Sequence, residues 1–141
     1  MTKDVFFVFA QFSIIGIFIY LQGFIPASNW LLSFHLLGGL LGLWSILSMS
    51  SSKLNIFPKV KNGSTLVKAG PYKVIRHPMY TALLLYFIPH ALAGTTNGII
   101  YIAFITILTF KLNYEEKLLL KAFEDYPAYR QNTYALLPFI Y

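Results

Sequence analysis

The charged side chains of this chain fall into three short stretches, and two long stretches between them carry no charge. Its eleven Lys and Arg and five Asp and Glu occur only in Lys3–Asp4, Lys53–Arg76 and Lys111–Arg130. The intervening Val5–Ser52 and His77–Phe110 contain none of these residues. Because charge is costly in hydrocarbon, this distribution predicts an integral membrane protein whose polar chemistry lies on one side of the bilayer.

Four hydrophobic runs are candidates for transmembrane helices. Val5–Ile25 and Trp30–Met49 each have about the 20 residues that a bilayer span needs. His77–Thr96 is interrupted by a proline, and Asn97–Leu112 is short, so the sequence leaves open whether these two cross completely. The turn residues of Ala93–Gly98 predict the tip of a helical hairpin between them.

A cleaved signal peptide is the alternative interpretation of the first run. Gly23-Phe24-Ile25-Pro26 lacks the small-residue cleavage site of such a peptide, and the run is longer than its usual apolar region. We therefore expect one all-α domain over residues 1–141 with about four transmembrane helices, a polar loop after the second and a C-terminal amphipathic helix.

Four crossings would place both termini and the loop Lys53–Arg76 on the same side. The excess of Lys and Arg there predicts that this side is cytoplasmic, and we expect the protein in the cytoplasmic membrane. The net charge of +6 favours contact with an anionic leaflet, which accounts for the basic character without nucleic acid as a partner.

Small and polar residues within the apolar runs predict contacts between helices. Gly38, Gly39 and Gly42 form a small-residue face that lets two helices approach closely. His35 and His90 have no Cys or carboxylate near them in sequence, so we expect them to hydrogen-bond between helices rather than to bind a metal.

The central loop offers what an anionic ligand would need. Gly70-Pro71 favours a tight turn, and His77-Pro78 favours a helix start whose N–H groups attract a carboxylate or phosphate. Three cations lie within nine residues: Lys68, Lys73 and Arg76. The alternative is an interfacial loop whose cations only snorkel and whose tyrosines belong to the aromatic belt.

A pair of carboxylates, Glu115 and Glu116, follows the fourth hydrophobic run. Adjacent residues on a helix point about 100° apart, so we expect one carboxylate to bind inward and the other to face solvent or a basic partner. Apolar residues at helical spacing within Leu118–Phe123 predict an amphipathic helix that lies over the loop and ends near Tyr126-Pro127.

Taken together, these motifs resemble the isoprenylcysteine carboxyl methyltransferase and phospholipid methyltransferase superfamily. The resemblance rests on Gly70-Pro71-Tyr72, then His77-Pro78-Met79-Tyr80 after four residues, Glu115-Glu116, and a tail of Phe123 followed by Tyr126 and Tyr129. It covers Ser64–Pro138, and it implies an integral membrane enzyme that uses S-adenosylmethionine.

The resemblance also implies roles for individual residues. Those that it assigns to the cofactor are Ser64, Thr65, Leu66, Val67, Tyr72, His77, Pro78, Met79, Tyr80 and Glu115. Lys111 stands where isoprenylcysteine enzymes carry an arginine implicated in substrate binding, which puts a bidentate clamp in doubt. A glycine that usually follows Phe123 is missing here, which puts the end of the last helix in doubt.

The residue types suit the chemistry of methyl transfer. Arg76 or His77 can hold the carboxylate of the cofactor, and Glu115 can accept a hydrogen bond from its ammonium or ribose. Tyr72 or Tyr80 can pack on the adenine or face the sulfonium. A carboxylate acceptor needs no general base, whereas an amine acceptor must be neutral, which calls for His77, Glu116 or a desolvated site.

The sequence thus predicts methyl transfer from S-adenosylmethionine to a lipid-like acceptor at the cytoplasmic membrane face. It does not distinguish an isoprenylcysteine carboxylate from a phospholipid amine. The alternatives are a membrane reductase of the sterol-reductase type that uses NADPH, and a membrane scaffold without activity. The chain is short enough for a homodimer to complete the active site.

Overall fold

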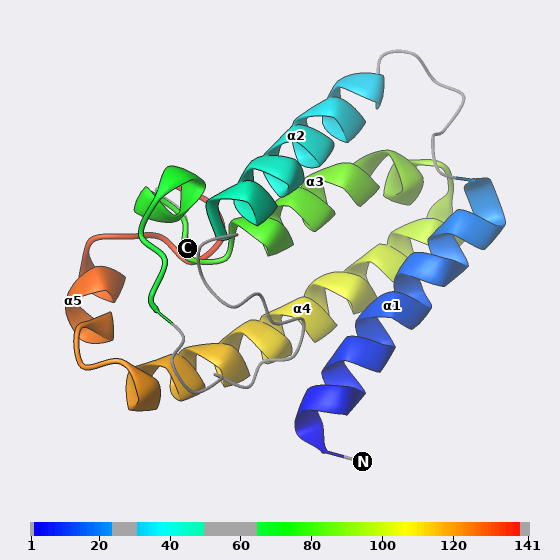
Figure 1. The fold of residues 1–141 in the computed structure, drawn as a ribbon. Coiled ribbons are helices and arrows are strands. Elements are labelled where there is room, and N and C mark those ends of the chain that lie inside the picture. The colour runs from blue at the N-terminus through cyan, green and yellow to red at the C-terminus, as the bar shows by residue number, and fades with distance from the viewer. Residues whose placement is uncertain (1, 24–30, 50–64, 139–141) are drawn as a thin grey trace.

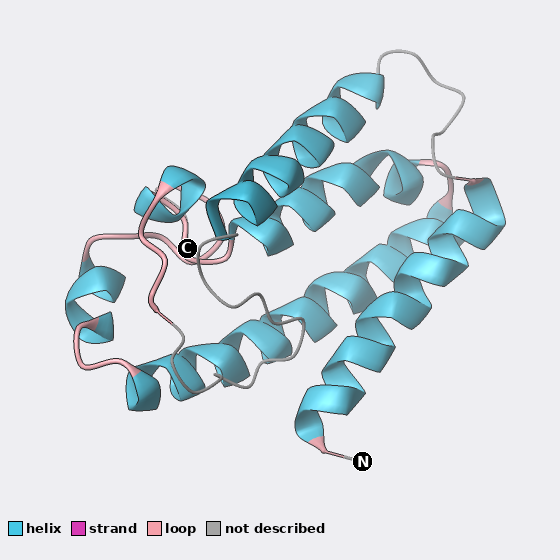
Figure 2. Ribbon diagram, in the orientation of Figure 1, coloured by secondary structure: helices cyan, strands magenta, loops and turns pink. Residues whose placement is uncertain are grey.

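A computed structural model of the chain describes residues 2–23, 31–49 and 65–138, most of which are helical. The elements are α1 (Lys3–Gln22), α2 (Leu32–Met49), the short 3₁₀ helix η2 (Gly70–Lys73), α3 (Pro78–Leu92), α4 (Thr95–Ala122) and α5 (Tyr126–Gln131). Among these residues no strand forms (Figure 2), and the one β-type contact is an isolated parallel bridge between Ile75 and Tyr134. The predicted all-α class is confirmed.

Within the described ranges, three helices are long and apolar enough to cross a membrane: α1, α2 and α4. The fourth apolar helix, α3, has 15 residues and extends about 22 Å, which is less than the roughly 30 Å of a hydrocarbon core. In contrast, α4 has 28 residues and extends about 42 Å. The expected four-helix membrane architecture is therefore present. Its second hairpin consists of the short helix α3 and the long helix α4.

The four apolar helices lie side by side in the order α1, α4, α3 and α2, as Figure 1 shows. Neighbours run antiparallel, because the start of α1 contacts the second half of α4 through the rings of Phe7 and Tyr114, 5.8 Å apart. At the opposite end of the bundle, the carbonyl of Gly23 accepts a hydrogen bond from His90 at 3.1 Å. We use the name charged end for the end of the bundle at which Phe7 meets Tyr114. It comprises η2, the start of α3, the part of α4 beyond Phe110, and α5.

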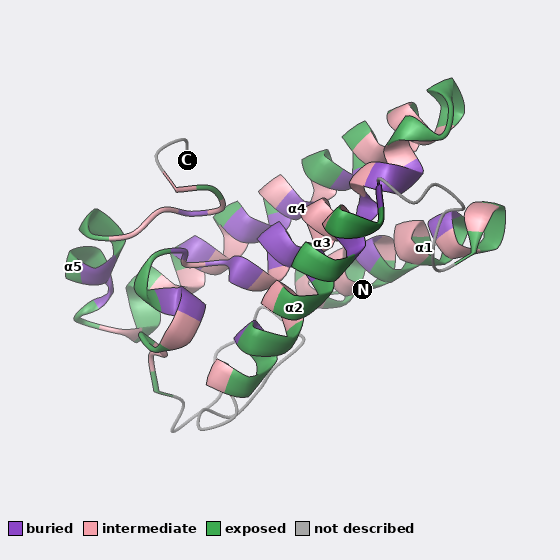
Figure 3. Ribbon diagram, turned by 90° about the horizontal axis from the view of Figure 1, so that it is seen from above, coloured by how far each residue is buried: buried purple, intermediate pink, exposed green. Residues whose placement is uncertain are grey.

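Aromatic side chains fill the centre of the bundle. Phe18 stacks on Phe87 at 5.2 Å, and Phe104 packs edge-on against both at 6.3 and 5.8 Å. The outward faces of the helices are apolar and exposed (Figure 3), and in α1 only Gln11 and Phe18 are buried. Such one-sided burial is what a bundle surrounded by lipid requires, since hydrocarbon covers the outer faces.

The contact between α2 and α3 depends on glycine. A Cβ atom on Gly38 would lie only 2.7 Å from the Ala82 carbonyl oxygen and 2.7 Å from the Tyr86 nitrogen. Gly42 would make an ordinary contact of 3.6 Å with Ala82 Cβ, whereas Gly39 has nothing within 4 Å. The predicted helix-packing role is confirmed for Gly38 and Gly42, and Gly39 lies off the contact face.

The second hairpin differs in detail from the expectation. Its turn is confined to Ala93 and Gly94, because Thr95–Gly98 already forms the first turn of α4. The stretch Leu118–Phe123, expected as a separate amphipathic helix, continues α4 as far as Ala122. No Gly or Pro interrupts the chain between Phe110 and Ala122, and its Glu, Lys and Leu residues are good helix formers.

Two buried histidines lie at the end of the bundle opposite the charged end. His90 is fully buried and bonds between helices to Gly23 through Nε2, as predicted. His35 instead packs its ring edge-on against Tyr86 at 4.5 Å, and neither of its ring nitrogens has a hydrogen-bond partner. In the described ranges no group of three or more His, Cys, Asp or Glu side chains is placed to hold a metal ion.

Candidate functional site

The turn before α3 has the local structure that its sequence predicts. Gly70 has φ +56° and opens η2, and an added Cβ there would overlap Ser48 and lie 3.1 Å from Trp44 Nε1. Pro78 then occupies the first turn of α3, with His77 as the preceding cap residue. The turn is therefore seated against the end of α2.

The C-terminal tail fixes the backbone between η2 and α3. Tyr134 N–H donates to Val74 O at 2.9 Å, and Arg76 N–H donates to Tyr134 O at 2.8 Å. His77 N–H donates to Ala135 O at 3.0 Å. These bonds hold residues 74–77 alongside the tail, which fixes the backbone position of His77.

Glu116 is buried and has partners from two segments, the residues before α3 and the helix α5. Its Oε1 accepts from Arg76 Nε at 2.9 Å and from Tyr126 OH at 2.7 Å, and lies 3.0 Å from His77 Nε2. Its Oε2 lies 3.2 Å from Arg130 Nε, an ion pair without hydrogen-bond geometry. Glu116 is thus the member of the carboxylate pair that faces basic partners.

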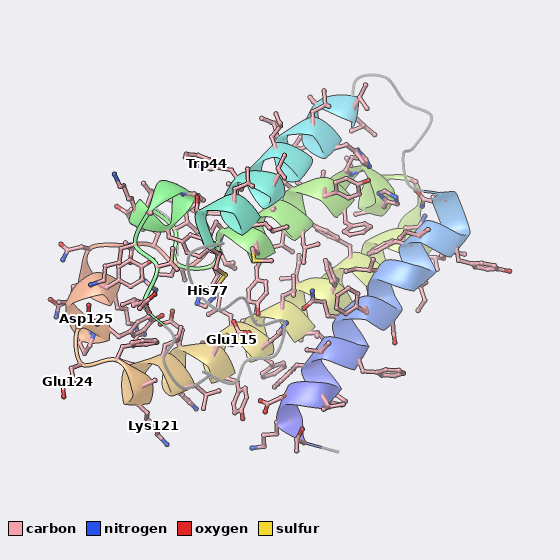
Figure 4. All side chains as sticks on the ribbon, viewed as in Figure 1. Trp44, His77, Glu115, Lys121, Glu124 and Asp125 are labelled. Atoms are coloured by element: carbon pink, nitrogen blue, oxygen red, sulfur yellow. The ribbon has the colours of Figure 1, made fainter. Side chains whose placement is uncertain are left out.

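Glu115 faces the start of α3 from the neighbouring position on α4. Its Oε1 accepts from Tyr80 OH at 2.6 Å, and its Oε2 lies 3.6 Å from His77 Nδ1. The rings of His77 and Tyr80 stack at 5.5 Å, and Figure 4 shows His77 and Glu115 directed at each other while Lys121 and Glu124 point outward. The imidazole of His77 therefore has a carboxylate beside each ring nitrogen.

Tyr72 adds a second phenol to this site. Its hydroxyl contacts Met49 Sδ at 3.5 Å, and its carbonyl accepts from Tyr129 OH at 2.7 Å. Burial, together with the negative charge of Glu115, raises the pKa of Tyr72 to about 12. The phenol is consequently neutral at physiological pH.

The guanidinium of Arg76 is used to join segments of the protein. Besides Glu116, it donates through Nη1 to Arg130 O at 3.0 Å and to the carbonyl of Thr133.

The first turn of α3 has few free backbone N–H donors, because Tyr80 N–H and Thr81 N–H both bond to His77 O, at 3.0 and 3.2 Å. Since Pro78 has no N–H, Met79 is the first-turn residue with a backbone donor available.

Lys111 does not reach the surface. It is buried and donates to Gln11 Oε1 of α1 at 2.8 Å, with its ammonium 5.2 Å from the ring centroid of Tyr80. Among the described residues it forms no ion pair, Glu115 included, although Glu115 is one helical turn away. It is therefore a buried cation whose direct partners are an amide and an aromatic face.

The remaining predicted cofactor residues precede η2. Ser64 lies outside the described residues, and Thr65, Leu66 and Val67 form the non-helical segment that leads into the turn. The next residue, Lys68, forms an ion pair with Asp125 and lies 5.9 Å from the ring centroid of Tyr129. This pair fastens the segment to the charged end.

Sequence reasoning assigned no role to three residues that the structure brings to the site. Gln11 could have been found from the sequence, because it is an amide in the middle of an apolar run. Tyr126 was noted only as part of a tail motif, and Arg130 only as a charge. Nothing in the sequence indicates that these two meet Glu116, because the contact depends on how α5 folds back.

These features define a class: an all-α membrane protein with a buried polar site at one end of its helices. A family model described as phospholipid methyltransferase matches residues 30–126, which is more than half of the chain. The chain belongs to the phospholipid methyltransferase family, in agreement with the resemblance of its motifs. Among curated proteins, no relative matches it.

Proposed function

We propose that the protein transfers the methyl group of S-adenosylmethionine to a lipid-like acceptor at the cytoplasmic face of the membrane. The observation that supports this most strongly is His77, which lies between the carboxylates of Glu115 and Glu116 beside two buried tyrosines. These are the motif residues on which the resemblance to the family rests, and His77 lies 38 and 39 positions from Glu115 and Glu116 in sequence.

The residues of the site fit the charges of the cofactor. Glu115 accepts a hydrogen bond from the ammonium or ribose, and Tyr72 and Tyr80 present aromatic faces to the adenine or the sulfonium. The Met79 N–H at the start of α3 holds the carboxylate, while His77 and Arg76, which contact Glu116, position this segment. Pro78 starts the helix, and Thr65, Leu66 and Val67, which precede η2, line the approach from the loop.

The cofactor supplies a methyl group activated by a sulfonium, so the protein has mainly to position the acceptor and exclude water. Lys111, buried between Gln11 and the Tyr80 ring, places a positive charge behind the site, where it would attract an acidic group of the acceptor. For an amine acceptor, His77 or Glu116 would take the proton, but the three donors on Glu116 Oε1 stabilise its anion and make it a weak base.

Ligand binding to the purified protein in detergent tests the proposal against its alternatives. We expect S-adenosylmethionine to bind and NADPH not to bind; a reductase would show the reverse, and a scaffold would bind neither. Glu115→Gln should weaken S-adenosylmethionine about ten- to a hundredfold, since a charge-assisted hydrogen bond contributes about 1.5–3 kcal/mol.

Glu124→Gln is the matched control, because Glu124 is exposed and points away from the site (Figure 4). It should bind the cofactor like the parent. If folded Glu115→Gln protein also binds as tightly as the parent, the cofactor site has been assigned to the wrong residues.

A further inference from the structure

Gln11 is a buried amide on α1, a helix that lies beside α4 (Figure 1). Its Oε1 accepts a hydrogen bond from Lys111 Nζ of α4 at 2.8 Å, and only 7% of Gln11 and 3% of Lys111 are exposed. Burying an amide is costly unless it is hydrogen-bonded, so this contact accounts for the presence of Gln11 in an apolar helix. Because α1 precedes residues 30–126, which the family model matches, the contact lies outside the matched region.

Lys111 has a charged residue closer to it in sequence than Gln11. Glu115 follows it by four residues on α4, a spacing that places two side chains on the same face of a helix. Opposite charges attract more strongly away from water than in it, so this spacing favours an ion pair. In the structure the ammonium of Lys111 instead bonds to Gln11 and lies 5.2 Å from the ring centroid of Tyr80.

The carboxylate of Glu115 consequently has no cationic side chain of Lys or Arg bound to it among the described residues. Its Oε1 accepts from Tyr80 OH at 2.6 Å, and its Oε2 lies 3.6 Å from His77 Nδ1. An ammonium bound to this carboxylate would neutralise its charge and occupy its lone pairs. The contact between α1 and α4 therefore affects how much of the negative charge of Glu115 a ligand can use.

We propose that Gln11 is a positioning residue, which holds the ammonium of Lys111 away from Glu115 and so keeps the carboxylate of Glu115 available to a ligand. Through this contact α1 takes part in the site, although it contains none of the motif residues. The consequence for S-adenosylmethionine rests on the proposed function, whereas the placement of the ammonium does not.

The affinity of the full chain for S-adenosylmethionine in detergent tests the proposal. Gln11→Leu removes the acceptor oxygen, so Lys111 should turn to Glu115 and cofactor binding should weaken about tenfold. Adding Lys111→Met to Gln11→Leu removes the diverted ammonium and should restore the parental affinity. Gln11→Glu retains an acceptor oxygen and should bind the cofactor like the parent. Ser13→Leu is the matched control, because it replaces an exposed polar residue of α1 and should have no effect.

A double-mutant cycle in reversible unfolding measures the ion pair without the cofactor. The coupling between Lys111→Met and Glu115→Gln should be stronger in Gln11→Leu protein than in the parent, by about fivefold in the unfolding equilibrium. Gln11→Met, which keeps an unbranched side chain, should give the same results and replaces Gln11→Leu if that variant does not fold.

Equal coupling in the two backgrounds would overturn the proposal, because the ammonium would then not have moved to Glu115. A cofactor affinity that Lys111→Met fails to restore would also overturn it, since a general disturbance of the packing by Gln11→Leu would then explain the loss. If the parent itself does not bind S-adenosylmethionine, the proposed function is wrong, and the cycle alone still decides the role of Gln11.

Discussion

Replacing Gly38 by Ala tests whether the close contact between α2 and α3 holds the bundle together. The added Cβ would lie 2.7 Å from two backbone atoms of α3, whereas ordinary contacts begin near 3.4 Å. Backbone atoms of a helix cannot rotate away as a side chain would, so α2 and α3 must separate locally by about 0.7 Å. Overpacking of this kind costs about 1–3 kcal/mol.

Gly39→Ala provides a matched control on the same helix. A Cβ on Gly39 would meet nothing within 4 Å. Both variants gain the same helix propensity, about 1 kcal/mol, so their difference isolates the packing cost. We expect Gly38→Ala to be less stable than Gly39→Ala by about 1–3 kcal/mol, which is roughly 5- to 150-fold in the unfolding equilibrium.

Reversible unfolding by SDS in mixed micelles, followed by circular dichroism, measures this difference. Cofactor affinity gives a second measurement, because the end of α2 seats η2 through Ser48 and contacts Tyr72 through Met49. Gly38→Ala should bind S-adenosylmethionine more weakly than Gly39→Ala. A Gly38→Ala protein as stable as Gly39→Ala would refute the packing argument.

Two further predictions concern the buried cation and the orientation of the chain. Lys111→Met, which keeps the volume of the side chain, should raise the acceptor KM or lower turnover while cofactor affinity stays nearly unchanged; an equal loss of cofactor binding would show that Lys111 instead supports Tyr80 and Glu115. The chain has no cysteine, so Ala69→Cys and Thr95→Cys, both at exposed positions, each introduce a single thiol. An impermeant reagent should label them from opposite sides of the membrane, and labelling of both from one side would contradict the hairpin topology.

The broad architecture could be predicted because it depends on local properties. Long uncharged runs specify apolar helices wherever they pack, and Gly70-Pro71 and His77-Pro78 favour a turn and a helix start through their own backbone constraints. The predicted helix boundaries in the hairpin of α3 and α4 were less accurate. Thr95 and Asn97 are as compatible with a first helical turn as with a loop, and the choice depends on the helix that follows.

The candidate site was only partly predictable. The sequence contains the motif residues that the structure places close together, and it indicated that Glu115 and Glu116 must face different ways. It did not indicate which one is buried, because burial of Glu116 depends on its contacts with Arg76, before α3, and with Tyr126 and Arg130 of α5.

The sequence by itself determined that this protein is a helical membrane protein with a methyltransferase motif at one end, since charge distribution and motif spacing are properties of the chain. Only the tertiary structure decided what each charge does. Lys111 and Gln11 are 100 positions apart, and they meet because α1 packs against α4. Arg76 reaches Glu116 and the carbonyl of Thr133 because the tail returns beside α3. A buried charge takes whichever partners the packing supplies, and packing between distant helices is not a local property of the chain.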